Sequence, residues 1–146
     1  MKKIIFATDD HLSSLALRLT LGLVVFAHGA QKLLGVWGGF GFTNTMNFFT
    51  TTVGLPWLVG LAVIVLEFFG ALLLLMGLVT RIIAMSYVIL AFGIVTTSHL
   101  QYGFFMNWFG TNSGEGYEFF LLWIGMAAAL AIDGGGKFSL DRKFFN

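Results

Sequence analysis

The sequence predicts an all-α integral membrane protein that folds as a four-helix bundle. Hydrophobic residues make up 58% of its 146 residues and charged residues only 10%, whereas about 25% of the residues in a typical soluble domain are charged. Four apolar segments are also long enough to cross a bilayer, which takes about 20 residues. Because lipid can solvate the apolar outside of a small bundle, we expect residues 1–146 to form a single membrane domain.

The predicted spans begin and end at residues that favour helix boundaries. Ser13 or Ser14 is a suitable N-cap for the first span, and Pro56, the only proline, precedes the second span, where its fixed φ suits a helix entry. The third span follows a very short link, and the fourth ends at Asp133 and three consecutive glycines. The four spans cover about residues 13–34, 57–79, 81–100 and 116–132.

Two connections, residues 35–56 and 101–115, are rich in glycine and aromatic residues. Segments this apolar are not expected to extend freely into water, and aromatic side chains favour the membrane interface. Residues 43–52 are therefore predicted to form a short interfacial helix, with Met46 and two phenylalanines facing the bilayer. We expect the two connections to form a lid over one end of the bundle.

Positive charge is concentrated at the opposite end of the predicted bundle. The cations that flank the spans there are Lys2, Lys3, Arg81, Lys137, Arg142 and Lys143. The two aromatic connections contain no lysine or arginine. The positive-inside rule therefore predicts a multi-pass protein of the cytoplasmic membrane with both termini in the cytoplasm.

Composition and motifs exclude several functions. The net charge of +1 and the lack of a basic run argue against nucleic acid as a partner. Without cysteine the chain cannot perform thiol–disulfide exchange or hold an iron–sulfur cluster. No haem-attachment motif or close-spaced pair of metal ligands is present, and the glycines of residues 38–41 do not match a phosphate-binding loop. No haem, nucleotide or metal cofactor is therefore indicated.

Polar side chains within the predicted spans indicate a functional site. A charged residue at membrane depth costs roughly 2.5 to 3.5 kcal/mol on insertion scales. Glu67 lies about ten residues into the second span, so about 15 Å deep. His28, Gln31 and Lys32 share one face near the end of the first span, because residues three and four apart are neighbours on a helix.

Two further polar residues are expected at the same level. His99 ends the third span and Glu118 begins the fourth. Because lipid cannot satisfy such groups, they are expected to face the interior of the bundle. The predicted result is a polar pocket in the outer half of the bundle, lined by His28, Gln31, Lys32, Glu67, His99 and Glu118.

Such a pocket suits an amphipathic ring with carbonyl or hydroxyl groups, such as a quinone. Glu67 and His28 are the candidate catalytic residues, because imidazole and carboxylate side chains relay protons. Gln31, Lys32 and His99 would hold the ring oxygens, and a fixed cation such as lysine stabilises an oxyanion. Glu118 and Trp37 are further ligand-binding candidates, and the aromatic residues of the lid, Trp37 among them, would sandwich the ring.

Structural roles are open for several of these residues. Lys32 could extend to the interface, and His28 with Gln31 could hydrogen-bond between helices. Glu118 could be a first-turn carboxylate that the helix dipole favours. An ion pair between Arg18 and Glu67 is disfavoured by a depth difference of roughly 7 Å.

Other functions are compatible with the same pattern. One is a non-enzymatic membrane scaffold or a carrier that binds a lipid or a small solute. The small residues of the fourth span would allow close packing within the bundle or against a second copy in a homo-oligomer. A redox enzyme acting alone is less favoured, because electrons would need a bound quinone and an external donor.

A series of motifs extends from about Leu17 to Asp141. These are LRLTLGLVVFAHGAQKLLGVWGGFG, GLP, LEFFGALLLLMGLVTR, His99 followed by GFF, GEGYEFFLL and SLD. In this order they resemble the DoxX family of small four-helix bacterial membrane proteins. The resemblance implies a four-helix bundle in the bacterial inner membrane.

The resemblance also implies an activity class and a set of positions. Family members include or resemble the membrane subunit of thiosulfate:quinone oxidoreductase, and others are associated with oxidative stress, thiol stress and catechol or quinone detoxification. A quinone as cofactor and an oxidoreductase as partner follow as expectations, and Arg18 joins the ligand-binding candidates on this basis. The family pattern falls on Arg18, His28, Gly29, Gln31, Lys32, Gly35, Glu67, Gly70, Arg81, His99, Tyr117 and Glu118.

Overall fold

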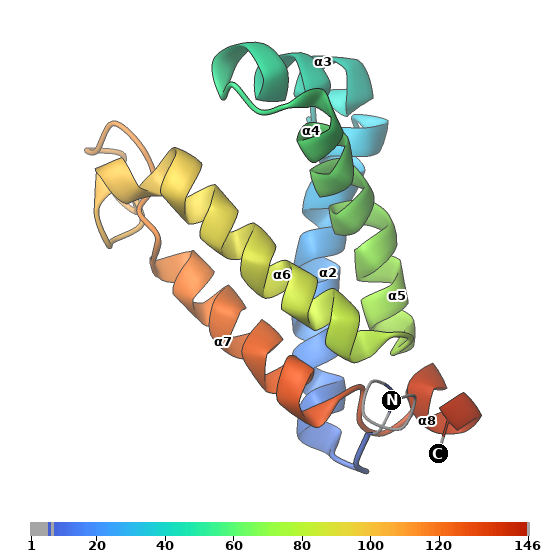
Figure 1. The fold of residues 1–146 in the computed structure, drawn as a ribbon. Coiled ribbons are helices and arrows are strands. Elements are labelled where there is room, and N and C mark those ends of the chain that lie inside the picture. The colour runs from blue at the N-terminus through green and yellow to red at the C-terminus, as the bar shows by residue number, and fades with distance from the viewer. Residues whose placement is uncertain (1–5, 7, 146) are drawn as a thin grey trace.

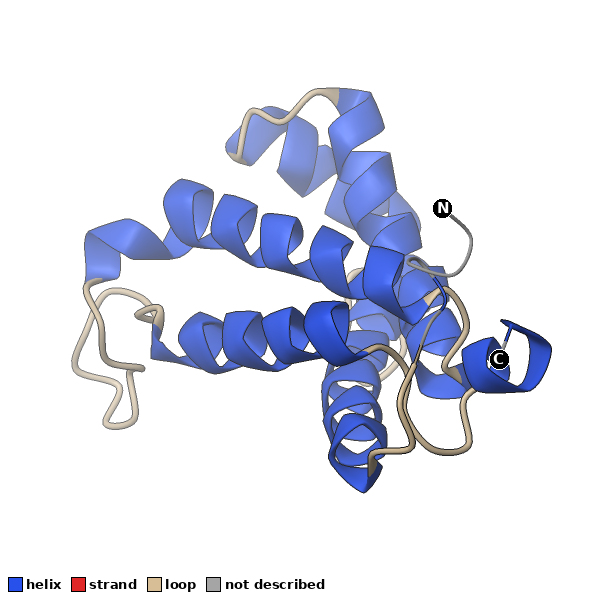
Figure 2. Ribbon diagram, turned by 60° about the horizontal axis from the view of Figure 1, so that its bottom comes forward, coloured by secondary structure: helices blue, strands red, loops and turns tan. Residues whose placement is uncertain are grey.

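The regular structure of the described chain is helical throughout. A computed structural model describes residue 6 and residues 8–145, and Figure 2 shows helices joined by loops in this part of the chain. Lys2 and Lys3, which contribute to the predicted orientation, lie outside the described residues. The α-helices are α2 (Leu12–Leu34), α3 (Gly41–Asn47), α4 (Trp57–Val65), α5 (Ala71–Met76), α6 (Thr80–Ile94), α7 (Glu118–Asp133) and α8 (Leu140–Phe145). Short π-helical segments are η1 (Phe48–Thr52), η2 (Leu66–Gly70) and η3 (Val95–His99), and η4 (Leu100–Tyr102) is a 3₁₀ turn.

Among the described residues, three helical segments are long and apolar enough to cross a membrane. They are Leu12–Leu34, Trp57–Met76 and Thr80–Tyr102, of 23, 20 and 23 residues. The first corresponds to α2, the second joins α4, η2 and α5, and the third joins α6, η3 and η4. The fourth predicted span corresponds to α7, whose 16 residues rise about 24 Å, less than the hydrocarbon core of about 30 Å.

The observed helix boundaries differ from the predicted ones by a few residues. The N-cap of α2 is His11, so the prediction of Ser13 or Ser14 is wrong. Ser14 is instead buried, and a Cβ at Gly136 would lie 2.5 Å from the Cβ of Ser14. The second span ends at Met76 because Gly77 adopts a left-handed φ of 66°, which terminates a helix.

The long helices form two antiparallel pairs (Figure 1). One pair is α2 with the continuous α4–α5 segment, and the other is α6 with α7. The two pairs meet near the end where both termini lie, which we call the terminal end. They diverge toward the opposite end, which carries α3 and the α6–α7 connection and is called the loop end. Contacts of α7 with α2 join the pairs.

Tyr87 makes an aromatic contact within the α6–α7 pair and a hydrogen bond to the other pair. Tyr87 of α6 is fully buried and packs edge-on against Trp123 of α7, with ring centroids 5.7 Å apart. The Tyr87 hydroxyl donates a hydrogen bond of 3.1 Å to the carbonyl of Leu66 on η2. Alanines at positions 84, 91 and 127 are also fully buried. Such small side chains allow helices in a membrane to approach closely.

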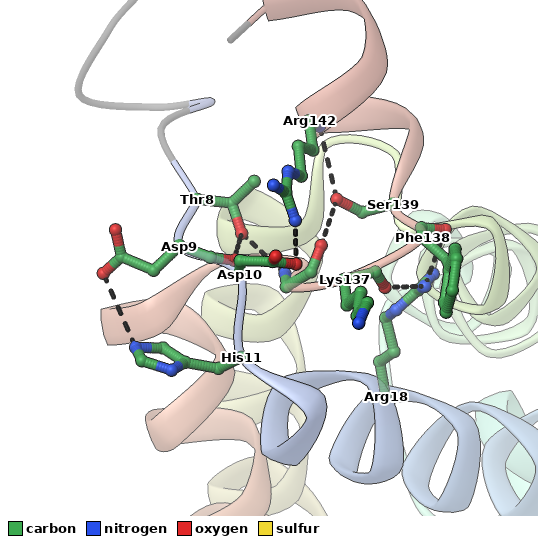
Figure 3. Close-up of polar contacts among 10 residues, drawn as sticks. Thr8, Asp9, Asp10, His11, Arg18, Lys137, Phe138, Ser139 and Arg142 are labelled. Atoms are coloured by element: carbon green, nitrogen blue, oxygen red, sulfur yellow. Dashed lines mark hydrogen bonds and ion pairs between the residues drawn. The ribbon is translucent and has the colours of Figure 1, made fainter.

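The terminal end is held together by side chains that bind backbone groups. The Arg18 guanidinium donates to the carbonyls of Leu75 (2.8 Å), Lys137 (3.0 Å) and Phe138 (2.9 Å), as Figure 3 shows for the last two. The Asp141 carboxylate accepts hydrogen bonds from the first amides of α6, Val79 N at 2.7 Å and Thr80 N at 2.8 Å. Arg18 therefore fastens the C-terminal segment to α2, and Asp141 caps α6.

A short helix does form in the first aromatic connection, over α3 and η1. Its side chains are not arranged as predicted. Met46 is buried, and both Met46 and Phe49 lie where a Cβ at Gly60 of α4 would touch them. Phe48 instead is 51% exposed. The helix thus packs Met46 and Phe49 onto α4 and leaves Phe48 on the surface.

Gly29 allows α2 and η2 to touch backbone to backbone. A Cβ at this position would lie 2.5 Å from the carbonyl carbon of Glu67. Gly29→Ala is therefore expected to push the two helices apart and lower the free energy of unfolding by about 1 to 3 kcal/mol. Thermal unfolding in detergent would measure the loss.

Gly125→Ala is the matched control for this substitution. Nothing lies within 4 Å of a Cβ at Gly125, and alanine in a helix is about 1 kcal/mol more favourable than glycine. This variant should melt at or above the wild-type temperature. If Gly29→Ala unfolded at the same temperature as Gly125→Ala, the close α2–η2 contact would be contradicted.

Candidate functional site

An ion pair inside the helical bundle is the centre of the candidate site. Lys32 Nζ, in the last turn of α2, lies 2.5 Å from Glu67 Oε2 on η2. The Glu67 side chain is only 2% exposed, whereas the Lys32 side chain is 27% exposed. Both residues belong to segments long and apolar enough to span a membrane. The carboxylate is thus enclosed by protein, and the ammonium group is partly accessible from outside.

The helix that carries Glu67 is locally distorted. Glu67 belongs to the π-helical segment η2, and single π turns inside α-helices occur frequently at functional sites. The Tyr87 hydroxyl bonds the carbonyl of Leu66, the residue before Glu67. Gly70 leaves room for this hydroxyl, because a Cβ there would lie 3.3 Å from it. The contacts from α2 and α6 hold the backbone of η2 in place on two sides.

His28 lies on α2 one turn before Lys32 and its side chain is exposed. An imidazole on the surface of a membrane-spanning helix is costly in lipid alone. The four-residue spacing places His28 and Lys32 on the same face of α2. The imidazole is therefore near the accessible side of the ion pair.

Gln31 and Trp37 interact with each other instead of with the ion pair. The Gln31 side chain donates a hydrogen bond of 3.2 Å to the carbonyl of Trp37. Trp37 has a left-handed φ of 51°, which is uncommon for a residue other than glycine, and is 69% exposed. Gln31 thus helps to hold the turn after α2, which presents the indole at the loop end.

His99 and Glu118 are bonded within the α6–α7 connection. His99 Nδ1 lies 2.8 Å from the carbonyl oxygen of Glu115, and its ring is 4.7 Å from that of Phe120. Glu118 Oε1 accepts hydrogen bonds of 3.0 Å from Met106 N and from the Trp108 indole. These contacts organise the connection at the loop end.

The structure therefore brings together only part of the predicted pocket. Lys32 and Glu67 are in direct contact, with His28 one turn away. Arg18 lies at the terminal end and binds carbonyls, so it does not pair with Glu67. A concave surface occurs elsewhere, at the loop end of the α6 segment, where it is lined by Thr96, Thr97, Ser98, Leu100 and Gln101.

Sequence reasoning missed Tyr87 and the structural role of Asp141. Tyr87 is one aromatic residue in an apolar helix, and its contact with η2 depends on how the pairs pack. A hydroxyl inside a predicted span needs a hydrogen-bond partner on another helix, and this requirement could have indicated Tyr87. Asp141 lies after the last span, and nothing in its neighbours along the chain indicates that it caps α6.

The chemistry available at the ion pair is hydrogen bonding and proton transfer. An ammonium group has three N–H donors, so Lys32 retains donors beyond its bond to Glu67.

The aromatic rings of Phe26 and Phe68 lie 5.3 Å apart, and Phe68 contacts the half-exposed Phe69. Within the described residues, no group of three histidine or acidic side chains could hold a metal ion.

Comparisons with known proteins give a family and one relative. The DoxX family profile matches residues 13–100, a stretch that contains His28, Lys32 and Glu67. The protein named "Putative oxidoreductase CatD" of Bacillus subtilis (strain 168) is 28% identical over 134 residues, which cover 92% of this chain and 88% of that protein. No solved structure matches the chain.

Removing either member of the ion pair should have unequal effects on stability. Lys32→Met leaves a carboxylate that is 2% exposed without its cation, and breaking a buried pair costs about 3 to 5 kcal/mol. Glu67→Gln should cost less, because the lysine is 27% exposed and can reach the interface. Thermal unfolding in detergent would compare the two variants.

The double variant Lys32→Met with Glu67→Gln should recover most of the stability lost in Lys32→Met, because no unpaired charge remains. Lys143→Met, at an exposed lysine of the terminal end, is the control and should change stability by about 0.5 kcal/mol or less. Strictly additive losses in the double variant would show that the two side chains do not interact.

Proposed function

The chain belongs to the DoxX family, and on that premise we propose that it binds a quinone or a similar amphipathic ring beside Lys32 and Glu67, as the membrane subunit or partner of an oxidoreductase system. The family assignment confirms the resemblance expected from the motifs. The observation that carries the proposal is the ion pair of a buried carboxylate with a partly exposed lysine inside membrane-spanning helices. The oxidoreductase name of the Bacillus subtilis relative supports the reaction class.

The energetics of the ion pair favour a functional role. A charged residue at the centre of a span costs roughly 2.5 to 3.5 kcal/mol on insertion scales, and a buried ion pair is often no more stable than a well-packed apolar pair. Leucine and methionine at these two positions would therefore serve the fold as well. The charges are better explained by what Lys32 and Glu67 bind or transfer.

Each residue of the site fits one task toward such a ring. A quinone, when bound, takes up two electrons and two protons, and the electrons would come from an oxidoreductase partner. Lys32 has free N–H donors on its accessible side and would bind a ring oxygen. Glu67, in contact with Lys32, would hold or release a proton, and His28 would carry protons at the exposed side.

We also propose that α7 is a fourth, short span that completes the four-helix bundle. Its outward side chains favour lipid over water, since Leu121, Leu122 and Ile132 are 57%, 68% and 71% exposed. Exposed aromatic residues on and next to α3 and η1, such as Phe40 at 77%, support an interfacial position for that segment. The cations at the terminal end support cytoplasmic termini in a bacterial inner membrane.

A thermal-shift measurement tests quinone binding. A short-chain ubiquinone or menaquinone added to the protein purified in detergent should raise its melting temperature, because a ligand that binds only the folded state stabilises it. Glu67→Gln and His28→Ala should each abolish the shift, because Glu67 holds the Lys32 ammonium in place and His28 lies at the accessible side where the ring is proposed to bind.

Two matched variants serve as controls. His11→Ala changes an exposed histidine at the terminal end, and Glu115→Gln changes an exposed carboxylate of the α6–α7 connection. Both should keep the full shift. The proposal is wrong if neither quinone shifts the wild-type protein, or if only added phospholipid does so.

A further inference from the structure

The C-terminal segment presents cations and aromatic rings together at the terminal end. Phe138, Phe144 and Phe145 are 74%, 62% and 46% exposed. Lys137 Nζ lies 5.6 Å from the ring centre of Phe138, and Lys143 Nζ lies 5.8 Å from that of Phe144. We call these five residues the basic–aromatic surface.

The backbone of this surface is fixed to the helical bundle. Arg18 binds the carbonyls of Lys137 and Phe138 (Figure 3). Asp141 accepts hydrogen bonds from the first amides of α6, and its own amide donates to the carbonyl of Gly77 at 2.9 Å. The surface therefore keeps a constant position relative to the ends of the spans.

Phe138 adopts a backbone conformation that is unfavourable for its side chain. Its φ is 56°, and a non-glycine residue in a left-handed conformation costs about 1 to 3 kcal/mol. Glycine would adopt this φ without strain. The exposed ring contributes little to the protein core, so its presence is better explained by a contact outside the protein.

The lysines of the surface are free to bind an external anion. Three carboxylates near this end have other partners: Asp10 pairs with Arg142, Asp9 lies 3.8 Å from His11, and the Asp141 carboxylate binds amides. The ion pairs of the described part of the chain include neither Lys137 nor Lys143.

The surface lies where the apolar helices end. At this level α5 ends at Met76, α6 begins at Thr80 and α7 ends at Asp133. Figure 1 shows α8 directly beside these helix ends. Aromatic rings favour the headgroup level of a bilayer, and lysines at that level face lipid phosphates.

We propose that the basic–aromatic surface binds the headgroups of anionic phospholipids in the bilayer that holds the protein. The rings of Phe138, Phe144 and Phe145 enter the interface, and Lys137 and Lys143 bind the lipid phosphates. This site is separate from the ion pair of Lys32 and Glu67. Lipid binding at this surface does not depend on whether the protein binds a quinone.

Native mass spectrometry of the full chain, with added phosphatidylglycerol or phosphatidylcholine, tests the proposal. The wild-type protein should retain phosphatidylglycerol in preference to phosphatidylcholine. The preference should weaken at high salt, because salt screens exposed charges. The double variant Lys137→Gln with Lys143→Gln should lose affinity for phosphatidylglycerol by about fivefold for each lysine removed.

The matched control, Lys137→Arg with Lys143→Arg, keeps both charges and should bind phosphatidylglycerol as the wild type does. Phe138→Gly removes the ring and relieves the left-handed backbone, so it should melt at or above the wild-type temperature yet retain less phosphatidylglycerol. Equal retention of the two lipids by the wild type, or unchanged binding in the glutamine variant, would overturn the proposal.

Discussion

A carboxylate enclosed within a membrane-spanning helix needs a cation beside it, and the contact between Lys32 and Glu67 meets this requirement. The surrounding packing holds the backbone on either side of this contact. Gly29 lets the backbone of α2 touch that of η2 at Glu67, and Tyr87 binds the carbonyl of Leu66 from the opposite helix pair. The close approach of α2 and η2 at Gly29 places Lys32 and Glu67 within hydrogen-bonding distance.

Polar groups away from the ion pair hold the two ends of the molecule. At the terminal end, Arg18 and Asp141 bind backbone groups of the C-terminal segment and of α6. At the loop end, Glu118 binds the amide of Met106 and the indole of Trp108. Both ends use charged side chains to satisfy backbone or indole groups, whereas the middle layer keeps a pair of charges that the fold does not require.

The sequence predicted the helices better than it predicted their contacts. The three long spans were expected within a few residues, because about 20 consecutive apolar residues are a strong signal. Glu67 and Lys32 were expected in one site because both lie at membrane depth. Arg18 was grouped with them by family resemblance, but it is bonded to carbonyls at the opposite end, and His99 is bonded to a carbonyl of the α6–α7 connection.

The sequence by itself determined that this is a helical membrane protein of the DoxX family with polar groups at a few depths, because hydrophobic composition, span length and motif order are properties of the chain. Only the tertiary structure decided which polar groups meet. A helix that is apolar on nearly all sides gives little indication of the face it turns inward. That rotation follows from close contacts, such as Gly29 against Glu67 and Tyr87 against Leu66, between residues far apart in the sequence.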